Sequence, residues 1–478
     1  MRYIFTILVL GFVFATLAAT PSRQSPRLPD TPAGRTFGAW LAAFNTGDPA
    51  KIRAYLRKYH PAAAKASIAD ELRFQFMTGG FDIRKILASF KTRLKVLIQE
   101  HDSDQMAQLD FALQNTPPYH VRELTLEPAQ RPADVTIEHL PQSQLIATTQ
   151  KLITEDVAAR RFAGAILIAK RGKVVYAQAS GFADRAKRIP NTLNTRFRIG
   201  SMNKMFTATA IMQLVQSGKI DLDHSVGTYL PDYPNKTVAS SVTIRELLMH
   251  TGGTGDIFGP QYEKNRLKLR SLQDYIDLYG KRGPQFKPGS RFAYSNYGFI
   301  ILGDVIQKVS GEDYYAYVRD HIYLPAGMTS SGSEPEHVAV PNRSVGYTLN
   351  DRLQWVPNSN MLGYRGSPAG GGYSTVGDLL KFAQALVAHK FLNTRYTEMM
   401  TTGKVAMPGG FKYGFGFGDE MHNGLRCFGH NGGAPGMAGD LKICDDGYTI
   451  VTLANVDPPA GRISDFIATR LPLAAARF

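Results

Sequence analysis

The chain has 478 residues, of which 44% are hydrophobic and 20% are charged, and its formal net charge is +15. That length favours a large globular domain with a smaller one beside it. The lysines and arginines are interleaved with 40 acidic residues, which excludes a dedicated nucleic-acid-binding protein and indicates at most weak attraction to an anionic envelope surface. Because only 2 cysteines occur, a disulfide scaffold and an all-cysteine metal site are excluded as well.

The first segment, residues 1–20, predicts a signal peptide. Arg2 precedes an apolar run, and the small residues Ala18 and Ala19 offer a cleavage site. We therefore expect a periplasmic or secreted protein, with an uncleaved N-terminal membrane anchor as the alternative. The proline-rich residues 21–35 would form a linker.

The next segment, residues 36–126, predicts a small α+β domain. Apolar side chains first recur at helical spacing, and Asp48 followed by Pro49 is typical of the start of a second helix. Strand-like runs follow at residues 93–101 and 119–127, and helices followed by strands indicate the α+β class. The residues expected to share the inner helical face are Trp40, Leu41, Phe44, Ile52, Tyr55 and Leu56.

This small domain resembles the cone-shaped domains of the nuclear-transport-factor and cystatin-like type. Its histidines His60 and His101 are polar residues of a kind that is more often hydrogen-bonded or exposed than ligating. No chemistry is assigned to it.

After a linker at residues 127–140, the remainder of the chain, residues 141–478, predicts one large domain. A helical pattern opens it, strands follow, helices fill the middle, and strands return at the end. We expect a mixed α/β (α+β) fold in which both ends of the domain build one antiparallel sheet, packed against a helical block. The predicted strands are residues 162–170, 173–181, 425–432, 437–446 and 448–457.

A serine and a lysine stand three residues apart where an apolar helix is predicted to begin. Residues three apart lie on one face of a helix, so Ser201 and Lys204 could touch if Ser201 is in the first turn. Burial and the positive potential at a helix N-terminus would lower the pKa of the lysine toward neutrality. The spacing alone is weak support for catalysis, because it arises by chance in many chains.

Two further segments supply groups that a serine–lysine hydrolase needs. Tyr294 and Asn296 offer a phenol and an amide on one short loop before a predicted helix. His430 and Asn431 are predicted at a strand end, and the glycine that follows, Gly432, lets a substrate approach the backbone.

Several long stretches, in this order, resemble the serine hydrolases of the class C β-lactamase, DD-peptidase and esterase type. The resemblance begins near Leu145 and reaches the end of the chain. The matching stretches are residues 197–223, 243–253, 288–328, 369–383, 413–418 and 429–437.

The resemblance implies a role for each matching residue. Ser201 would be the nucleophile that accepts the acyl group, Lys204 its base, and Tyr294 a partner in the proton transfers. The backbone N–H groups of Ser201 and Gly433 would form the oxyanion hole. No cofactor and no metal are implied.

The resemblance also implies substrate contacts. Asn296 would hold the acyl side of the substrate, and His430 would take the place where relatives have lysine or histidine. Asn431 and Gly432 would complete this edge. Relatives that act on β-lactams or D-alanyl peptides tend to have serine or threonine where this chain has Asn431. This difference weakens the case for either activity in this chain.

Two other segments have the residue types and spacing of the tyrosine and histidine motifs but lie in an unsuitable structural context. Tyr233 and Asn235 lie in a proline-rich turn, which is a poor place to fix a phenol. His250 ends a predicted helix ahead of the tyrosine motif, and we interpret it as a helix-terminal residue favoured by the helix dipole.

The cysteines flank the predicted C-terminal hairpin almost symmetrically. Cys427 and Cys444 could therefore face each other across adjacent strands and form a disulfide in an oxidising compartment.

Three functions remain open from the sequence. The first is an exported esterase or amidase acting on small acyl substrates. The second is a penicillin-binding DD-carboxypeptidase or β-lactamase, and the third is a catalytically silent binding protein. The expected partner is a small-molecule or peptide acyl substrate, and the oligomeric state is open.

Overall fold

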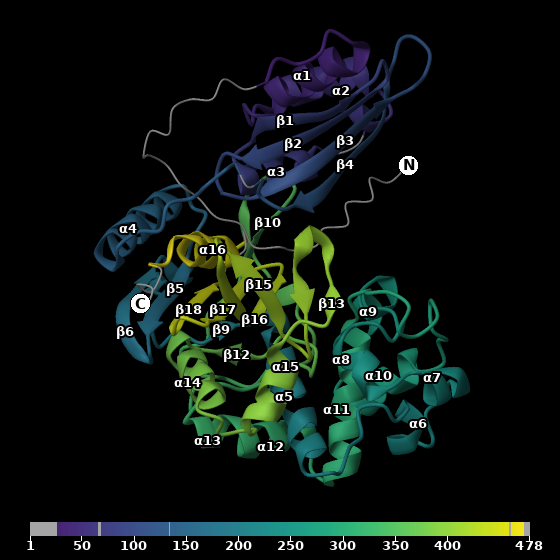
Figure 1. Cartoon of the computed structure of the whole chain (residues 1–478), viewed down its shortest axis with the longest axis vertical. Helices are drawn as coiled ribbons and strands as arrows, with labels where there is room; N and C mark the ends of the chain where they lie inside the picture. The colour runs from purple at the N-terminus through teal and green to yellow at the C-terminus, as the bar shows by residue number, and fades with distance from the viewer. Residues whose placement is uncertain (1–25, 66–67, 133, 458–459, 473–478) are drawn as a thin grey trace.

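The computed structural model describes residues 26–65, 68–132, 134–457 and 460–472. The predicted signal peptide lies outside these ranges. Figure 1 shows a small N-terminal unit placed on one side of a larger unit that holds the rest of the chain. Within the described ranges, no helix combines the length and the apolar character needed to cross a bilayer.

The N-terminal unit is a four-stranded antiparallel sheet covered by helices, in the order β1-β2-β3-β4. Prolines begin the first two helices, and the side chains of Thr31 and Asp48 cap them. Phe37 packs edge-on against Phe111, which joins helix to sheet. The elements are α1 (Pro32–Phe44), α2 (Pro49–Tyr59), η1 (Ala63–Lys65), α3 (Ala69–Thr78), β1 (Phe81–Ser89), β2 (Arg93–Glu100), β3 (Met106–Leu113) and β4 (Val121–Ala129).

Three strands of this unit differ from the sequence prediction, since neither β1 nor β3 was predicted and β4 ends later than expected. Strand β1 was not predicted, because its solvent-facing half breaks the apolar alternation with charged residues. Strand β4 continues to Ala129, so the predicted linker begins inside a strand. Pro128 is tolerated there because β4 is the edge of the sheet.

The large unit is built on an eight-stranded antiparallel sheet with the order β13-β14-β15-β16-β17-β18-β5-β6. Strands from its two ends are adjacent, since β18 pairs with β5 and Ile450 lies opposite Ile168. The predicted sheet from both ends of the domain is confirmed. Its strands are β5 (Gly164–Lys170), β6 (Lys173–Ser180), β13 (Val405–Ala406), β14 (Lys412–Tyr413), β15 (Gly418–His422), β16 (Leu425–Ala434), β17 (Met437–Cys444) and β18 (Tyr448–Ala454).

Helices cover both faces of this sheet (Figure 1). On β17, Leu441 and Ile443 face the helical block, whereas Ala438 and Cys444 face α4 (Gln142–Ala158) and α16 (Gly461–Arg470). The sequence predicted the opening helix α4 but placed only the helical block against the sheet. Helix α16 was not predicted, because its buried arginines make it read as polar.

The helical block and the short connecting elements make up the middle of the chain. The helices are α5 (Asn203–Gln216), α6 (Val226–Tyr229), α7 (Lys236–Ser241), α8 (Ile244–Leu248), α9 (Pro260–Asn265), α10 (Leu272–Tyr279), α11 (Asn296–Ser310), α12 (Tyr314–Val318), α13 (Leu324–Ala326), α14 (Val376–Val387) and α15 (Thr394–Thr401). The short elements are η2 (Gly200–Met202), η3 (Arg319–Tyr323), η4 (Ser359–Met361), η5 (Pro408–Gly410), β7 (Phe182–Asp184), β8 (Ile189–Pro190), β9 (Phe197–Arg198), β10 (Tyr347–Leu349), β11 (Trp355–Pro357) and β12 (Tyr373–Ser374).

The turn between β2 and β3 docks on the large unit. Arg470 at the end of α16 binds Asp104 with both terminal nitrogens, at 2.6 and 3.2 Å. The amide of Gln105 donates to Asp465, also on α16, at 3.3 Å. These polar contacts join the N-terminal sheet to the helix that covers the back of the large sheet.

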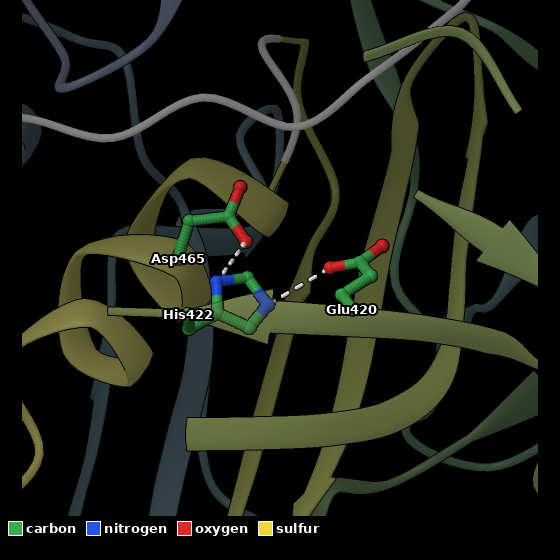
Figure 2. A group of neighbouring side chains, drawn as sticks. All are labelled: Glu420, His422 and Asp465. Atoms are coloured by element: carbon green, nitrogen blue, oxygen red, sulfur yellow. Dashed lines mark hydrogen bonds and ion pairs between the residues drawn. The ribbon is translucent and has the colours of Figure 1, made fainter. Parts of the chain in front are cut away.

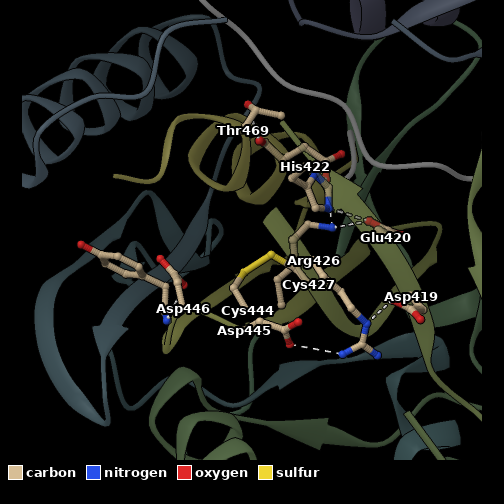
Figure 3. Close-up of a disulfide and its surroundings, with 12 residues drawn as sticks. Asp419, Glu420, His422, Arg426, Cys427, Cys444, Asp445, Asp446 and Thr469 are labelled. Atoms are coloured by element: carbon tan, nitrogen blue, oxygen red, sulfur yellow. Dashed lines mark hydrogen bonds and ion pairs between the residues drawn. A yellow bond between two sulfur atoms is a disulfide. The ribbon is translucent and has the colours of Figure 1, made fainter. Parts of the chain in front are cut away.

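A disulfide joins Cys427 to Cys444, which lie directly opposite each other on β16 and β17 (Figure 3). Beside it, Arg426 pairs with Asp419 at 2.7 Å and with Asp445 at 3.2 Å. The bond fixes β16 to its neighbour three residues before His430 on the same strand.

Candidate active site

Ser201 lies in the one-turn helix η2, directly before the buried helix α5. Lys204 occupies the first turn of α5 and has no exposed surface. The phenol of Tyr294, on the loop before α11, interacts with the side chain of Ser201. The structure thus brings the predicted serine, lysine and tyrosine together.

The Lys204 amine is enclosed by polar acceptors and an aromatic ring. Its Nζ donates to Oδ1 of Asn296 at 2.7 Å and to the carbonyl of Ala369 at 2.6 Å, and lies 4.7 Å from the centre of the Tyr294 ring. Burial lowers the pKa of Lys204 to about 7, against the opposing attraction of Asp256. A substantial fraction of this lysine is therefore a neutral amine at neutral pH.

The pKa of Tyr294 is shifted in the opposite direction from that of Lys204. Burial raises the pKa of its phenol, and the interaction with Ser201 offsets only part of that effect. The residue therefore keeps its proton at neutral pH. It can donate a proton or pass one on, and Lys204 is the group of the pair that is able to accept one.

Asn296 is held between a cation and an anion. Its Oδ1 accepts from Lys204, and its Nδ2 donates to the two carboxylate oxygens of Asp256 at 2.9 and 3.2 Å. This amide was predicted to hold the acyl side of a substrate. In the structure both ends of the amide are engaged by protein, and the Asp256 that binds its Nδ2 is half-buried.

Glycines let β16 lie directly against the backbone of Ser201. A Cβ placed on Gly432 would lie 1.9 Å from the carbonyl oxygen of Ile199 and 2.9 Å from the amide nitrogen of Ser201. One placed on Gly200 would lie 2.8 Å from the amide nitrogen of Gly433. The amide groups predicted to form the oxyanion hole are therefore neighbours across this contact.

His430 faces the site but has no free nitrogen. Its Nδ1 lies 2.5 Å from the carbonyl of Asn431, and its Nε2 lies 2.9 Å from the hydroxyl of Tyr413. Burial lowers the pKa of His430 to about 3, with a further contribution from Lys204. The ring is therefore neutral at physiological pH, and it lacks the positive charge that would hold a substrate carboxylate.

Asn431 lies on the opposite face of the sheet. Side chains alternate along a strand, so Asn431 shares the face of Cys427, which packs in the core on the α16 side. Its register partner on β17 is the buried Asp440. The predicted contact of the Asn431 side chain with a substrate therefore does not follow from this geometry.

His250 is part of the site, although the sequence analysis set it aside. It is 1% exposed, and its ring lies 4.2 Å from that of Tyr294 and 4.8 Å from that of Tyr413. Burial lowers its pKa well below the usual value, with contributions from Lys204 and His430. A charge–dipole explanation for this residue is wrong, because the ring is buried and uncharged.

Tyr233 and Asn235, the other pair with the spacing of the tyrosine motif, have structural roles. The hydroxyl of Tyr233 lies 2.9 Å from that of Tyr297, and Asn235 caps α7 by accepting from the amide of Val238. Neither residue reaches the serine.

Three residues of the site were missed from the sequence: Asp256, Tyr413 and Ala369. The first two could have been found from the sequence. Asp256 ends a glycine-rich turn, and Tyr413 begins a stretch that carries the family resemblance. Ala369 acts through its carbonyl, which sequence cannot indicate.

One cluster of potential metal ligands occurs among the described residues, on the back of the sheet. Figure 2 shows His422 between Glu420 and Asp465. The ammonium of Lys442 lies 2.9 Å from Glu420 and 2.9 Å from Asp465. A lysine thus already supplies the positive charge that these carboxylates require.

Comparison with known proteins identifies the family. Residues 149–474 match the family described as Beta-lactamase. The chain belongs to the β-lactamase family. The match leaves the N-terminal sheet outside, and the predicted family resemblance is confirmed.

Several relatives show the range of this β-lactamase family. A penicillin-binding protein from Bacillus halodurans is 33% identical, with a TM-score of 0.61 over 66% of this chain and 97% of that one. A D-stereospecific amidohydrolase from Streptomyces is 27% identical, with a TM-score of 0.58 over 68% of this chain and 98% of that one. Esterase EstB from Burkholderia gladioli is 31% identical over 44% of this chain and 57% of its own. This chain is accordingly a serine hydrolase of the β-lactamase-related type.

Proposed function

We propose that this β-lactamase family protein is an exported esterase or amidase that acts through an acyl-enzyme on Ser201. The observation that carries the proposal is the buried Lys204, whose pKa is about 7 and whose Nζ lies 4.7 Å from the ring centre of Tyr294, the phenol that interacts with Ser201. A base that is partly deprotonated at neutral pH and a proton donor that stays protonated then flank one hydroxyl.

Acylation would proceed as follows. The neutral amine of Lys204 takes the proton of Ser201 Oγ, and Oγ forms a bond to the carbonyl carbon of the substrate. The carbonyl electrons move to its oxygen, where the amides of Ser201 and Gly433 donate hydrogen bonds. Tyr294 gives its proton to the leaving oxygen or nitrogen and takes one back from the Lys204 ammonium, which regenerates the amine.

Deacylation would reverse these roles with water as the nucleophile. Tyr294 and Lys204 together remove a proton from water, its oxygen attacks the acyl carbon, and Ser201 Oγ leaves with that proton. The carboxylic acid product and the original protonation states result. No external co-reactant is needed.

The carboxylate of Asp256 favours a substrate whose acyl part carries an amine. The carboxylate of Asp256 presents a negative charge next to Asn296 and accepts hydrogen bonds. An ammonium group on the substrate would be attracted there, whereas an amide carbonyl would meet a second acceptor. We therefore propose small aminoacyl esters or amides as the preferred substrates, and the kinship with a D-stereospecific amidohydrolase supports the amidase activity.

A penicillin-binding enzyme is the second candidate, supported by the kinship with the Bacillus halodurans protein. The neutral His430 argues against it, since a fixed cation is what would hold the carboxylate of a β-lactam or a D-alanyl peptide. The engaged amide of Asn296 argues against it too.

A direct test combines substrates with covalent probes. Hydrolysis of p-nitrophenyl acetate and of glycine p-nitroanilide, lost in Ser201→Ala, supports the proposal. Stable labelling by a fluorescent penicillin without ester or amide turnover would favour the second candidate. A protein inert to these substrates, to penicillin and to a fluorophosphonate would be a silent binding protein, and the proposal would fail.

Export is proposed on the basis of residues 1–20 and is supported by the disulfide between Cys427 and Cys444, which requires an oxidising compartment. Expression of the full chain in a bacterium followed by N-terminal sequencing tests it. A mature protein in the periplasm that begins after Ala19 supports export, and a reduced cytoplasmic protein with an intact N-terminus contradicts it.

A further inference from the structure

His250 holds the backbone on both sides of Tyr294. Its carbonyl oxygen accepts from the amide of Ala293 at 2.9 Å, and its Nδ1 accepts from the amide of Ser295 at 3.1 Å. Between these two bonds, the imidazole packs 4.2 Å from the phenol ring. One residue therefore fixes the backbone before Tyr294, the backbone after it, and the plane of the ring.

The conformation and protonation of His250 are unusual for a core residue. Its φ is +58°, in the left-handed region that few residues other than glycine and asparagine occupy without strain. Because Nδ1 accepts a hydrogen bond, the neutral ring carries its proton on Nε2, and this atom is buried without a hydrogen-bond partner among the described residues. Backbone strain and an unpaired buried donor both cost stability, and such costs concentrate at functional sites.

A purely structural role does not account for these features. A leucine would fill the same volume without burying an unpaired N–H group, but it could not accept from Ser295. The imidazole supplies what leucine lacks: an acceptor on a rigid ring that binds the amide of Ser295, the residue directly after Tyr294. Ser295 is held further through its hydroxyl, which donates to the carbonyl of Gly255 and lies 2.9 Å from the hydroxyl of Thr254.

We propose that His250 is a positioning residue that clamps Tyr294 so that its phenol stays aligned with Ser201 and Lys204. The proposal rests on the proposed function, in which Tyr294 protonates the leaving group. His250 itself touches no substrate and transfers no proton. A loosened clamp would leave Ser201 and Lys204 intact but would weaken proton delivery to the leaving group.

That difference defines the experiment. Benzyl acetate and p-nitrophenyl acetate deliver the same acyl group, but only the benzyl alkoxide needs a proton in order to leave. Their kcat/KM values report acylation for both esters. In Tyr294→Phe we expect the benzyl ester to lose about tenfold or more beyond any loss for the p-nitrophenyl ester.

A matched pair of variants isolates the acceptor. Asparagine and glycine both tolerate the left-handed φ, and both keep the carbonyl bond to Ala293. Only His250→Asn places an oxygen near the position of Nδ1. We expect His250→Gly to lose about tenfold on benzyl acetate relative to p-nitrophenyl acetate, and His250→Asn to stay within about threefold of the wild-type ratio.

The outcomes separate the two proposals. Ester hydrolysis that persists in Ser201→Ala would contradict the proposed function, whatever the His250 variants show. Equal losses on both esters in His250→Gly, or equal ratios in His250→Asn and His250→Gly, would overturn the clamp. In the Tyr294→Phe background, His250→Gly should not change the ester ratio further, and an additive change would also overturn it. If His250→Gly does not fold, His250→Gln replaces it, because its amide lies at the level of Nε2 and cannot reach the Ser295 amide.

Discussion

The side-chain amide of Asn296 connects Lys204 to Asp256, accepting from the amine at 2.7 Å and donating to the carboxylate at 2.9 Å. A buried base is thus coupled through one amide to a charge at the edge of the site. Under the proposed function, this relationship should set both the pH at which the enzyme is active and the kind of substrate it prefers.

The pH dependence of acylation follows from Lys204. Because its pKa is lowered to about 7, the neutral amine predominates above that pH and the ammonium below it. We expect kcat/KM for p-nitrophenyl acetate to fall about tenfold per pH unit below that midpoint and to be level above it. A profile that is flat down to pH 5 would exclude Lys204 as the base.

Asp256 controls the position of that midpoint. Its carboxylate favours the Lys204 ammonium and so raises the lysine pKa. Asp256→Asn should therefore shift the acid limb of the kcat/KM profile to lower pH. A shift to higher pH would contradict the assigned electrostatics. Glu263→Gln, on the exposed surface of the nearby α9, serves as a control and should leave the profile unchanged.

Asp256 should also set substrate preference. A hydrogen bond to a charged group contributes ~1.5–3 kcal/mol, which corresponds to about tenfold or more in kcat/KM. We expect Asp256→Asn to lose that factor on glycine p-nitrophenyl ester relative to p-nitrophenyl acetate at a pH above the lysine midpoint. Equal effects on the two esters would mean that the carboxylate does not meet the substrate amine.

The contact between Gly432 and Ser201 leaves no room for a side chain. An alanine Cβ at position 432 would lie 1.9 Å from Ile199 O, so Gly432→Ala must displace the strand that carries Gly433. Loss of one oxyanion donor lowers the rate by about 100-fold or more, and we expect a loss of this order in acylation.

Gly377→Ala in α14 is the matched control for Gly432→Ala, since its added Cβ meets nothing nearer than 3.9 Å. It should retain full activity. A Gly432→Ala enzyme with wild-type rates would show that β16 does not form the oxyanion hole.

Docking of the N-terminal sheet depends on a partly buried ion pair. Removal of the Asp104 carboxylate leaves Arg470 without its bidentate partner, and Asp104→Ala should destabilise the protein by ~1–3 kcal/mol, measured by urea unfolding. Asp30→Ala removes the partner of Arg35, a pair in which the side chains are 89% and 61% exposed, and should have little effect. Equal unfolding midpoints for the two variants would contradict a stabilising interface.

The sequence predicted those site residues that belong to short, contiguous motifs. Ser201, Lys204 and Tyr294 lie in such patterns, and the structure brings them together as expected. Helix α16 escaped prediction because Arg462 and Arg470 are buried through ion pairs that only the fold supplies. Polarity in the sequence therefore concealed a core element.

The environment of a side chain was the part that sequence could not supply. His430 was expected to contact a substrate, but its Nε2 is bonded to the hydroxyl of Tyr413, two strands away in the same sheet. Asn296 was predicted to hold the acyl side of a substrate, and its contact with Asp256 could not be read from the sequence. His250 was set aside because it ends a predicted helix ahead of the tyrosine motif. Its contacts with Ala293 and Ser295 form only when the two loops meet in the fold.

The most direct test of the central claim is intact-mass and peptide mapping of the enzyme mixed briefly with p-nitrophenyl acetate and quenched in acid. We predict one acetyl group on the peptide that contains Ser201, formed more slowly below pH 7 and absent in Ser201→Ala. Ester hydrolysis that persists in Ser201→Ala, or an acetyl group on another residue, would contradict the account.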